Sequence, residues 1–149
     1  MSSNAIRLIS DSRYEEAKAA EAIKPGHLVK LDVNGDLINH NVEGGLAERA
    51  VALEDALQGK TVDDAYAADD VVRYWLPKKG DEMQLRAKAG EATALVIGTV
   101  LISNGDGTVK AEADAGGAVA DRIGIAVEAL DITGGTPGDG DALVAVRIL

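Results

Sequence analysis

The sequence predicts an all-β protein: a compact β-barrel or sandwich built from two pseudo-repeats of hairpin units, with an N-terminal arm. The first observation behind this prediction is that short runs of β-branched and aliphatic residues are separated by Gly, Asn-Gly and Asp-Gly. This pattern is typical of strands joined by tight turns. The second is that the later half of the chain repeats the pattern of the earlier half. The third is that amphipathic helix signals are scarce.

The N-terminal residues differ from the rest of the chain. Residues 5–9 form a short apolar run, and residues 11–19 are charged and rich in Ala. Two interpretations stay open here: a first strand followed by a helical turn, or an extended arm that docks on a neighbour. We assign residues 1–19 as an N-terminal arm and residues 20–149 as one barrel-like domain.

A β-hairpin is predicted early in this domain. The apolar run 27–31 is followed by Asn34-Gly35-Asp36, and Asn-Gly suits the positive φ angles of a two-residue hairpin turn. Further strands are expected at residues 50–53, 71–76, 83–87, 99–102, 109–113, 123–129 and 143–149. The strands 71–76 and 143–149 could extend the sheet of a neighbouring molecule if either lies at an edge.

The chain repeats itself at an offset of about 70–74 residues. Residues 20–36 resemble residues 90–107, and residues 48–57 resemble residues 121–131. Each half then closes with one more strand. We place the pseudo-repeats at about residues 20–77 and 90–149. Neither half carries enough apolar surface to fold alone, so we expect the two to share one core.

Composition narrows the classes of function. The 149 residues carry a net charge of −10 and contain no Cys. The negative charge argues against nucleic acid or an anionic membrane as a direct partner, because binding phosphate requires a basic face. The absence of Cys excludes disulfides, thiol nucleophiles and Cys-based zinc sites. No apolar run is long enough to span a bilayer, and the first residues do not resemble a signal peptide.

The sequence contains no well-formed metal-binding or catalytic motif. Asp32 begins an acidic turn with Glu43 at the twelfth position, which resembles a calcium loop, but Leu37 stands where that loop requires Gly. The same residues are explained by a hairpin turn. His27 and His40 are isolated, and no nucleophile motif accompanies them. We therefore expect no catalytic residue, no metal and no cofactor, and a protein that is not an enzyme.

Tyr74 and Trp75 are the best interface candidates by residue type, because Trp and Tyr are enriched in binding hot spots. They also serve as core residues in a chain without Phe. Strand alternation places the two side chains on opposite faces. One can therefore be buried while the other is exposed.

Two segments of the chain are similar to one protein family. Residues 20–31 with the following Asn-Gly-Asp turn, and the strand 122–129 with its Gly-Ile-Ala, resemble tailed-bacteriophage capsid decoration (cement) proteins. The chain departs from that pattern at His27, where a small acidic residue is more usual, and at Val96-Ile97, which lengthen the second copy. The resemblance implies a barrel-like domain with an N-terminal arm, located in the virion on the outer capsid surface and made in the host cytoplasm.

The resemblance also implies the partners. The protein would bind the major capsid protein, bridge adjacent capsid subunits and stabilise the expanded shell, with neighbouring copies of itself as further partners. A trimer is the expectation, and a dimer stays open. The residues expected at the capsid or subunit interface are Ile6, Arg7, Leu8, Ile9, Arg13, Tyr14, Tyr74 and Trp75. The alternative function is a small β-rich virion or surface module that binds glycans or another ligand through an exposed aromatic residue.

Overall fold

The computed structural model describes residues 5–9, 13–116, 120–134 and 141–149, apart from the side chains of residues 7–9. The described chain is almost entirely β, as the sequence predicts. Its strands are β1 (Arg7–Ile9), β2 (Tyr14–Lys18), β3 (Val29–Leu31), β4 (Leu37–Asn39), β5 (Val51–Ala52), β6 (Val71–Trp75), β7 (Glu82–Lys88), β8 (Val100–Ser103), β9 (Val109–Ala111), β10 (Arg122–Ala126) and β11 (Asp141–Ile148). Two single-turn 3-10 helices, η1 (Ala56–Gln58) and η2 (Glu112–Ala115), are found among these residues.

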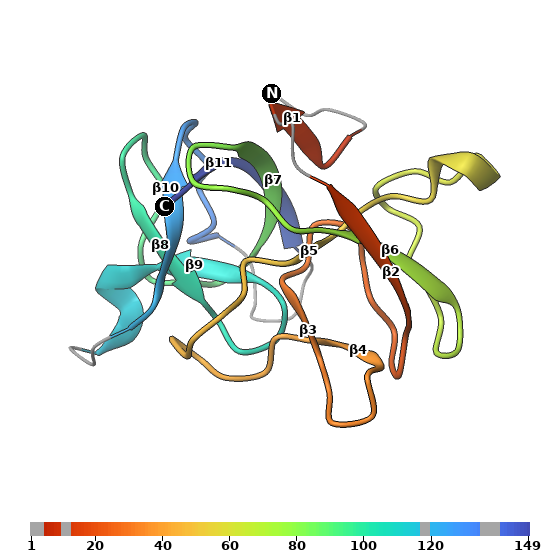
Figure 1. The fold of residues 1–149 in the computed structure, drawn as a ribbon. Helices are drawn as coiled ribbons and strands as arrows, with labels where there is room; N and C mark the ends of the chain where they lie inside the picture. The colour runs from red at the N-terminus through yellow and green to blue at the C-terminus, as the bar shows by residue number, and fades with distance from the viewer. Residues whose placement is uncertain (1–4, 10–12, 117–119, 135–140) are drawn as a thin grey trace.

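The second half of the chain forms a closed β-barrel (Figure 1). Its strands follow the order β7-β11-β10-β8-β9, and a parallel bridge between Ala87 and Val109 joins β9 back to β7. All other pairings in this ring are antiparallel. β1 lies on the outer edge of β7, so the N-terminal segment contacts the second half directly. The predicted barrel is therefore confirmed.

The first half repeats the same ring of strands. β2, β6 and β5 form one sheet, and β3 and β4 form a hairpin. A bridge between Leu28 and Val51 joins the hairpin to β5, and a parallel bridge between Ala19 and Leu37 joins it to β2. The order β2-β6-β5-β3-β4 is thus equivalent to β7-β11-β10-β8-β9, including the position of the parallel contact. The predicted pseudo-repeat is visible in the strand pairing.

Individual hydrogen bonds repeat as well. Gly26 N–H donates to Ala52 O at 2.9 Å, and Gly98 N–H donates to Ala126 O at 2.8 Å. Both glycines occupy a tight turn with φ of +90° and +91°, a conformation that costs Gly little and other residues more. The two turns are equivalent parts of the two units. Their local geometry follows from the Gly that the sequence places at each position.

Each structural unit begins one strand earlier than the sequence indicates. β2 and β7 are equivalent, yet the expected limits at residues 20 and 90 leave both strands out. The helical turn considered for the N-terminal segment is wrong, because Tyr14–Lys18 pairs with β6 over its whole length. The side chains of Glu15 and Ala17 on β2 are half-buried, so this strand lacks the apolar alternation that identifies others.

Two hydrophobic clusters make up the core. The main cluster fills the second-half barrel and the junction between the halves, and it includes Ile6, Trp75 and Leu85. A smaller cluster fills the first half and includes Val72 and Tyr74. β6 therefore has core on both faces. The two units are packed as one body, which agrees with the expectation of a shared core.

The expectation that strands 71–76 and 143–149 could lie at an edge is wrong. β6 lies between β2 and β5, and β11 lies between β7 and β10. The closing strand of each unit is central because it pairs with both the first strand of the unit and the strand that precedes it along the chain. In the larger sheet the outermost strands are β1 and β9, and β9 is joined back to β7. In the three-stranded sheet they are β2 and β5, and each is joined by a bridge to the β3–β4 hairpin.

Candidate interaction surface

The N-terminal interface candidates occupy different environments. Ile6 is completely buried in the main core, so it stabilises the fold and offers no surface. Arg7, Leu8 and Ile9 form the backbone of β1, while their side chains lie outside the described part of the structure. Arg13 and Tyr14 are exposed at the start of β2. Of these candidates, Arg13 and Tyr14 are the two whose side chains are described and exposed to solvent.

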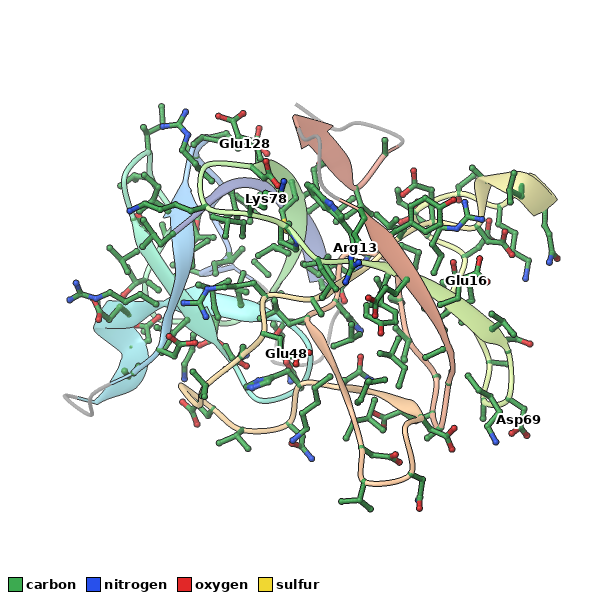
Figure 2. All side chains as sticks on the ribbon, in the orientation of Figure 1. Arg13, Glu16, Glu48, Asp69, Lys78 and Glu128 are labelled. Atoms are coloured by element: carbon green, nitrogen blue, oxygen red, sulfur yellow. The ribbon has the colours of Figure 1, made fainter. Side chains whose placement is uncertain are left out.

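The exposed face of β2 carries Tyr14, Glu16 and Lys18, and we call it the β2 ridge; Glu16 is labelled on this strand in Figure 2. The Arg73 guanidinium lies 4.6 Å from the centre of the Tyr14 ring, within the range of a cation–π contact. Arg73 also contacts Glu16, with 3.5 Å between Nη2 and Oε1. Arg13 pairs with Glu15 at 3.1 Å. Exposed pairs of this kind contribute little stability, so the ridge is available for other contacts.

Tyr74 and Trp75 are both buried, and the expectation that one of them would be exposed is wrong. They do lie on opposite faces of β6, but each face meets a hydrophobic cluster. The Tyr74 hydroxyl donates to Glu15 Oε2 at 3.0 Å. Burial and this hydrogen bond raise the pKa of Tyr74 to about 12. The glycan-binding alternative thereby loses the two aromatic residues on which it depended.

A buried ion-pair network joins the two halves. Arg86 on β7 is only 3% exposed. Its Nη1 donates to Asp141 Oδ1 at 2.7 Å and its Nε donates to Pro25 O at 2.7 Å. Its Nη2 donates to Val62 O. The guanidinium therefore reaches two loops of the first half and one strand of the second, which indicates a structural role.

Asp141 is the anion of this network. Burial by itself would raise the pKa of Asp141, but the hydrogen bond from His27 and the nearby Arg86 and Lys24 outweigh it and lower the pKa to about 2. The His27 Nε2 lies 3.5 Å from Asp141 Oδ2. The carboxylate of Asp141 contacts His27 and Lys24 of the first half and Arg86 of the second, so Asp141 stabilises the interface between the halves.

Replacing Asp141 should change the stability of the protein towards acid. A folded pKa of about 2 lies below the usual Asp value of about 3.9, so the carboxylate stabilises the fold above pH ~4. That contribution disappears as the pH falls towards 2. We expect the unfolding free energy of Asp141→Asn to lie below that of the wild type near neutral pH and to approach it near pH ~2. Urea unfolding at a series of pH values measures this. A constant difference at every pH would contradict the assignment.

An exposed apolar groove lies between the β3–β4 hairpin and the loop that follows it. It is lined by Lys30, Leu31, His40, Leu46, Ala47 and Glu48. Leu46 is 86% exposed and Leu31 is 45% exposed. Figure 2 shows Glu48 of this loop near the middle of the view. We call this surface the hairpin groove.

The loop that carries Leu46 is held by buried polar contacts. His40, 1% exposed, donates from Nε2 to Leu46 O at 2.9 Å, and its Nδ1 lies 2.6 Å from Ser103 Oγ. Asp121 of the second half accepts from Ala47 N–H at 3.0 Å. His40 is therefore a structural anchor, and the apolar side chain of Leu46 is presented to solvent by an ordered backbone. Leu46 and the groove around it are not among the residues that the sequence predicts for an interface.

The acidic turn that resembles a calcium loop is a hairpin turn. Asp32 Oδ1 accepts from Asn34 N–H at 2.8 Å and from Asp36 N–H at 3.0 Å. This is the self-contained hydrogen bonding of an Asx turn. Over the residues that the structure describes, no group of three or more His, Asp or Glu is arranged to hold a metal ion.

Comparison with protein-family models and with curated proteins finds no match to this chain. Among the described residues, no helix has the length and apolar character needed to cross a membrane. The features of the surface that bear most directly on function are the hairpin groove and the β2 ridge.

Proposed function

We propose that the protein is a structural, non-enzymatic capsid decoration protein. It binds the outer surface of a tailed-phage capsid, bridges adjacent major capsid protein subunits and stabilises the expanded shell. The observation that carries this proposal is the hairpin groove, in which an ordered loop presents Leu46 almost fully to solvent. Large apolar side chains held in this way are typical of interaction surfaces.

The groove is suited to binding a protein surface. Fully burying one Leu side chain is worth about 1.5–3 kcal/mol, so Leu31 and Leu46 together could dominate a small interface. The contacts of His40 and Asp121 fix the loop before any partner arrives. Less conformational entropy is then lost on binding, which favours affinity.

Charge and copy number support the same role. The net charge of −10 complements basic patches on a shell. Individually weak contacts become strong when many copies bind a lattice, because attachment at one point raises the effective concentration at the next. A protein that binds only the expanded shell stabilises that state by mass action.

The network around Arg86 and Asp141 supports a non-enzymatic role. This is the most buried group of charged side chains in the described structure, and its polar atoms are occupied by contacts between the two halves. The charged groups of this network stabilise the fold and are already engaged in hydrogen bonds. The exposed groups suit the binding of another protein.

Leu46→Asp should weaken capsid binding by at least tenfold and leave the fold intact, because it places a charge in the centre of the apolar groove. Purified protein is mixed with empty procapsids and with expanded capsids of the phage that encodes it, and binding is measured by co-sedimentation. We expect the wild type to pellet with expanded capsids.

The matched control is Leu57→Asp, which alters another Leu that is 78% exposed on η1, outside the groove. We expect this variant to bind like the wild type. Wild-type protein that remains in the supernatant with expanded capsids would refute the function. Equal binding by Leu46→Asp and wild type would refute the role of the groove.

A further inference from the structure

At the interface between the two halves, a turn of the first half packs against two strands of the second. The turn at residues 24–26 of the first half lies against β7 between the places where β1 and β9 pair with this strand, and Arg86 N–H donates to Gly26 O at 3.0 Å. Leu28 N–H donates to Gly107 O at 2.8 Å. A Cβ on Gly26 would lie 2.9 Å from Leu143 Cδ2, so the turn is in close contact with β11.

Four residues of the second half receive this turn. Arg86 and Asp141 form an ion pair at 2.7 Å, Leu143 supplies the apolar contact and Gly107 accepts the backbone hydrogen bond. Lys24 of the turn adds a second cation, with its Nζ 3.9 Å from Asp141 Oδ1. We call Arg86, Gly107, Asp141 and Leu143 the filled socket.

The first half contains the same four positions. Lys18 pairs with Val71 across β2 and β6, as Arg86 pairs with Leu143 across β7 and β11. Asp69 precedes Val71 by two residues, as Asp141 precedes Leu143. Gly35 lies in the β3–β4 turn with φ +82°, as Gly107 lies in the β8–β9 turn with φ +86°. These four equivalents are Lys18, Gly35, Asp69 and Val71, and we call them the open socket.

The chemistry of the two sockets is also the same. Each contains a cation paired with a carboxylate, an aliphatic residue and a turn glycine. Lys18 Nζ lies 3.7 Å from Asp69 Oδ1, in the place of the Arg86–Asp141 pair. Asp69 lies at the outer end of the first half, beyond Glu16 on β2 (Figure 2).

The open socket is uncovered. Val71 is 62% exposed, and a Cβ on Gly35 would meet nothing within 4 Å. Arg13 and Ala19 bond to the β6 side, so the alternate residues Glu16 and Lys18 direct their N–H groups outward. Within the described chain no acceptor receives these two groups. At the equivalent positions of β7, both N–H groups are bonded, to Ile6 O and to Gly26 O.

The turn that would fill this socket is uncovered too. Residues 96–98 are the equivalent of residues 24–26, with Gly98 in place of Gly26. Val96 is 58% exposed and Ile97 is 74% exposed. A Cβ on Gly98 would meet nothing within 4 Å, whereas Gly26 is in contact on one side with the filled socket.

We propose that a second copy of the chain covers both surfaces: the turn 96–98 of one copy docks in the open socket of the next. Gly98 O then accepts from Lys18 N–H of the neighbour, and Val96 and Ile97 pack near its Val71. The contact repeats, between chains, the interface that each chain already makes between its halves. It is a heterologous contact, so successive copies form a ring when the rotation closes. This inference does not depend on capsid binding.

The first test is the oligomeric state of Ile97→Glu. Ile97 is exposed, so the variant should fold, but it would place a carboxylate in the apolar contact with Val71 of the neighbour. We expect wild-type protein to have a mass that is a multiple of 15.4 kDa by light scattering, and Ile97→Glu to have the mass of one chain. Val42→Glu, at a residue of the loop after β4 that is 51% exposed and belongs to neither surface, should behave like the wild type. A single-chain mass for the wild type overturns the proposal, as does an unchanged oligomer in Ile97→Glu.

A second variant should strengthen the contact. Val96 is the equivalent of Lys24, so Val96→Lys would place an ammonium group near the neighbour's Asp69, as Lys24 lies near Asp141. We expect association to tighten by up to about fivefold, the range of an exposed ion pair. The gain should disappear when Asp69→Asn is added. An equal gain with and without Asp69→Asn would place the contact elsewhere.

Cross-linking locates the contact directly. The chain contains no Cys, so the double variant Val96→Cys/Asp69→Cys reacts with a short bis-maleimide only at these two sites. We expect covalent dimers and larger products from the double variant, and from a mixture of the two single variants. Covalent dimers from each single variant alone, at the yield of the mixture, would contradict the head-to-tail arrangement.

Discussion

Arg86→Ala is expected to destabilise the protein by about 3–5 kcal/mol, which is the usual cost of removing one partner from a buried charge pair. Arg86 is 3% exposed and donates to Pro25 O, Val62 O and Asp141. Truncation leaves these acceptors without their donor. Both units should be destabilised, because the guanidinium lies on the second half and donates to Pro25 O and Val62 O of the first.

Urea unfolding followed by circular dichroism measures this effect. The matched control is Arg147→Ala, which removes an Arg from the neighbouring strand. Arg147 pairs with Glu82 at 2.7 Å, but its side chain is 50% exposed, so we expect a loss below about 1 kcal/mol. Similar losses for the two variants would show that the Arg86 network does not hold the halves together.

Trp75→Ala should destabilise the protein by about 3–5 kcal/mol, since it leaves a large cavity in the main core. Trp75 is completely buried and lies on β6, the strand with core on both faces. Neighbouring side chains such as those of Ile6 and Leu85 belong to the same cluster and cannot collapse into so large a space.

Trp75→Phe separates packing from hydrogen bonding. Among the described residues, no acceptor faces the Trp75 Nε1–H, so losing this group removes a polar atom that was buried without a partner. We expect Trp75→Phe to cost clearly less than Trp75→Ala in the same urea experiment. Equal costs for Trp75→Phe and Trp75→Ala would contradict the view that the volume of the ring sets the cost at this position.

The sequence was informative where structure is set locally. The glycines at positions 26, 35 and 98 have positive φ angles, a geometry that few other residues adopt. The hairpin predicted at Asn34-Gly35 is found, but the two-residue turn is wrong: Asp32 N–H donates to Asp36 O, and Gly35 has the positive φ while Asn34 does not. The repeat was visible because both units use these turns and the same short aliphatic strands. The barrel fold could therefore be predicted from the residues.

The sequence was uninformative where tertiary contacts decide burial. Tyr74 and Trp75 alternate as expected, but alternation cannot show that β6 has a core on each side. β2 carries a charged pattern because its outer face is exposed and Tyr74 partners Glu15 on its inner face. Nothing in the sequence around Leu46 predicts that its side chain is exposed. The exposure depends on tertiary hydrogen bonds that hold the loop, from His40 to Leu46 O and from Ala47 N–H to Asp121.

A cryo-electron microscopy reconstruction of expanded capsids mixed with the purified protein shows where each chain binds. For a capsid decoration protein we expect added density on the outer shell, in which each chain has two similar units and the loop carrying Leu46 faces the capsid protein. Shells that show no added density, or density in which the hairpin groove faces solvent, would contradict it.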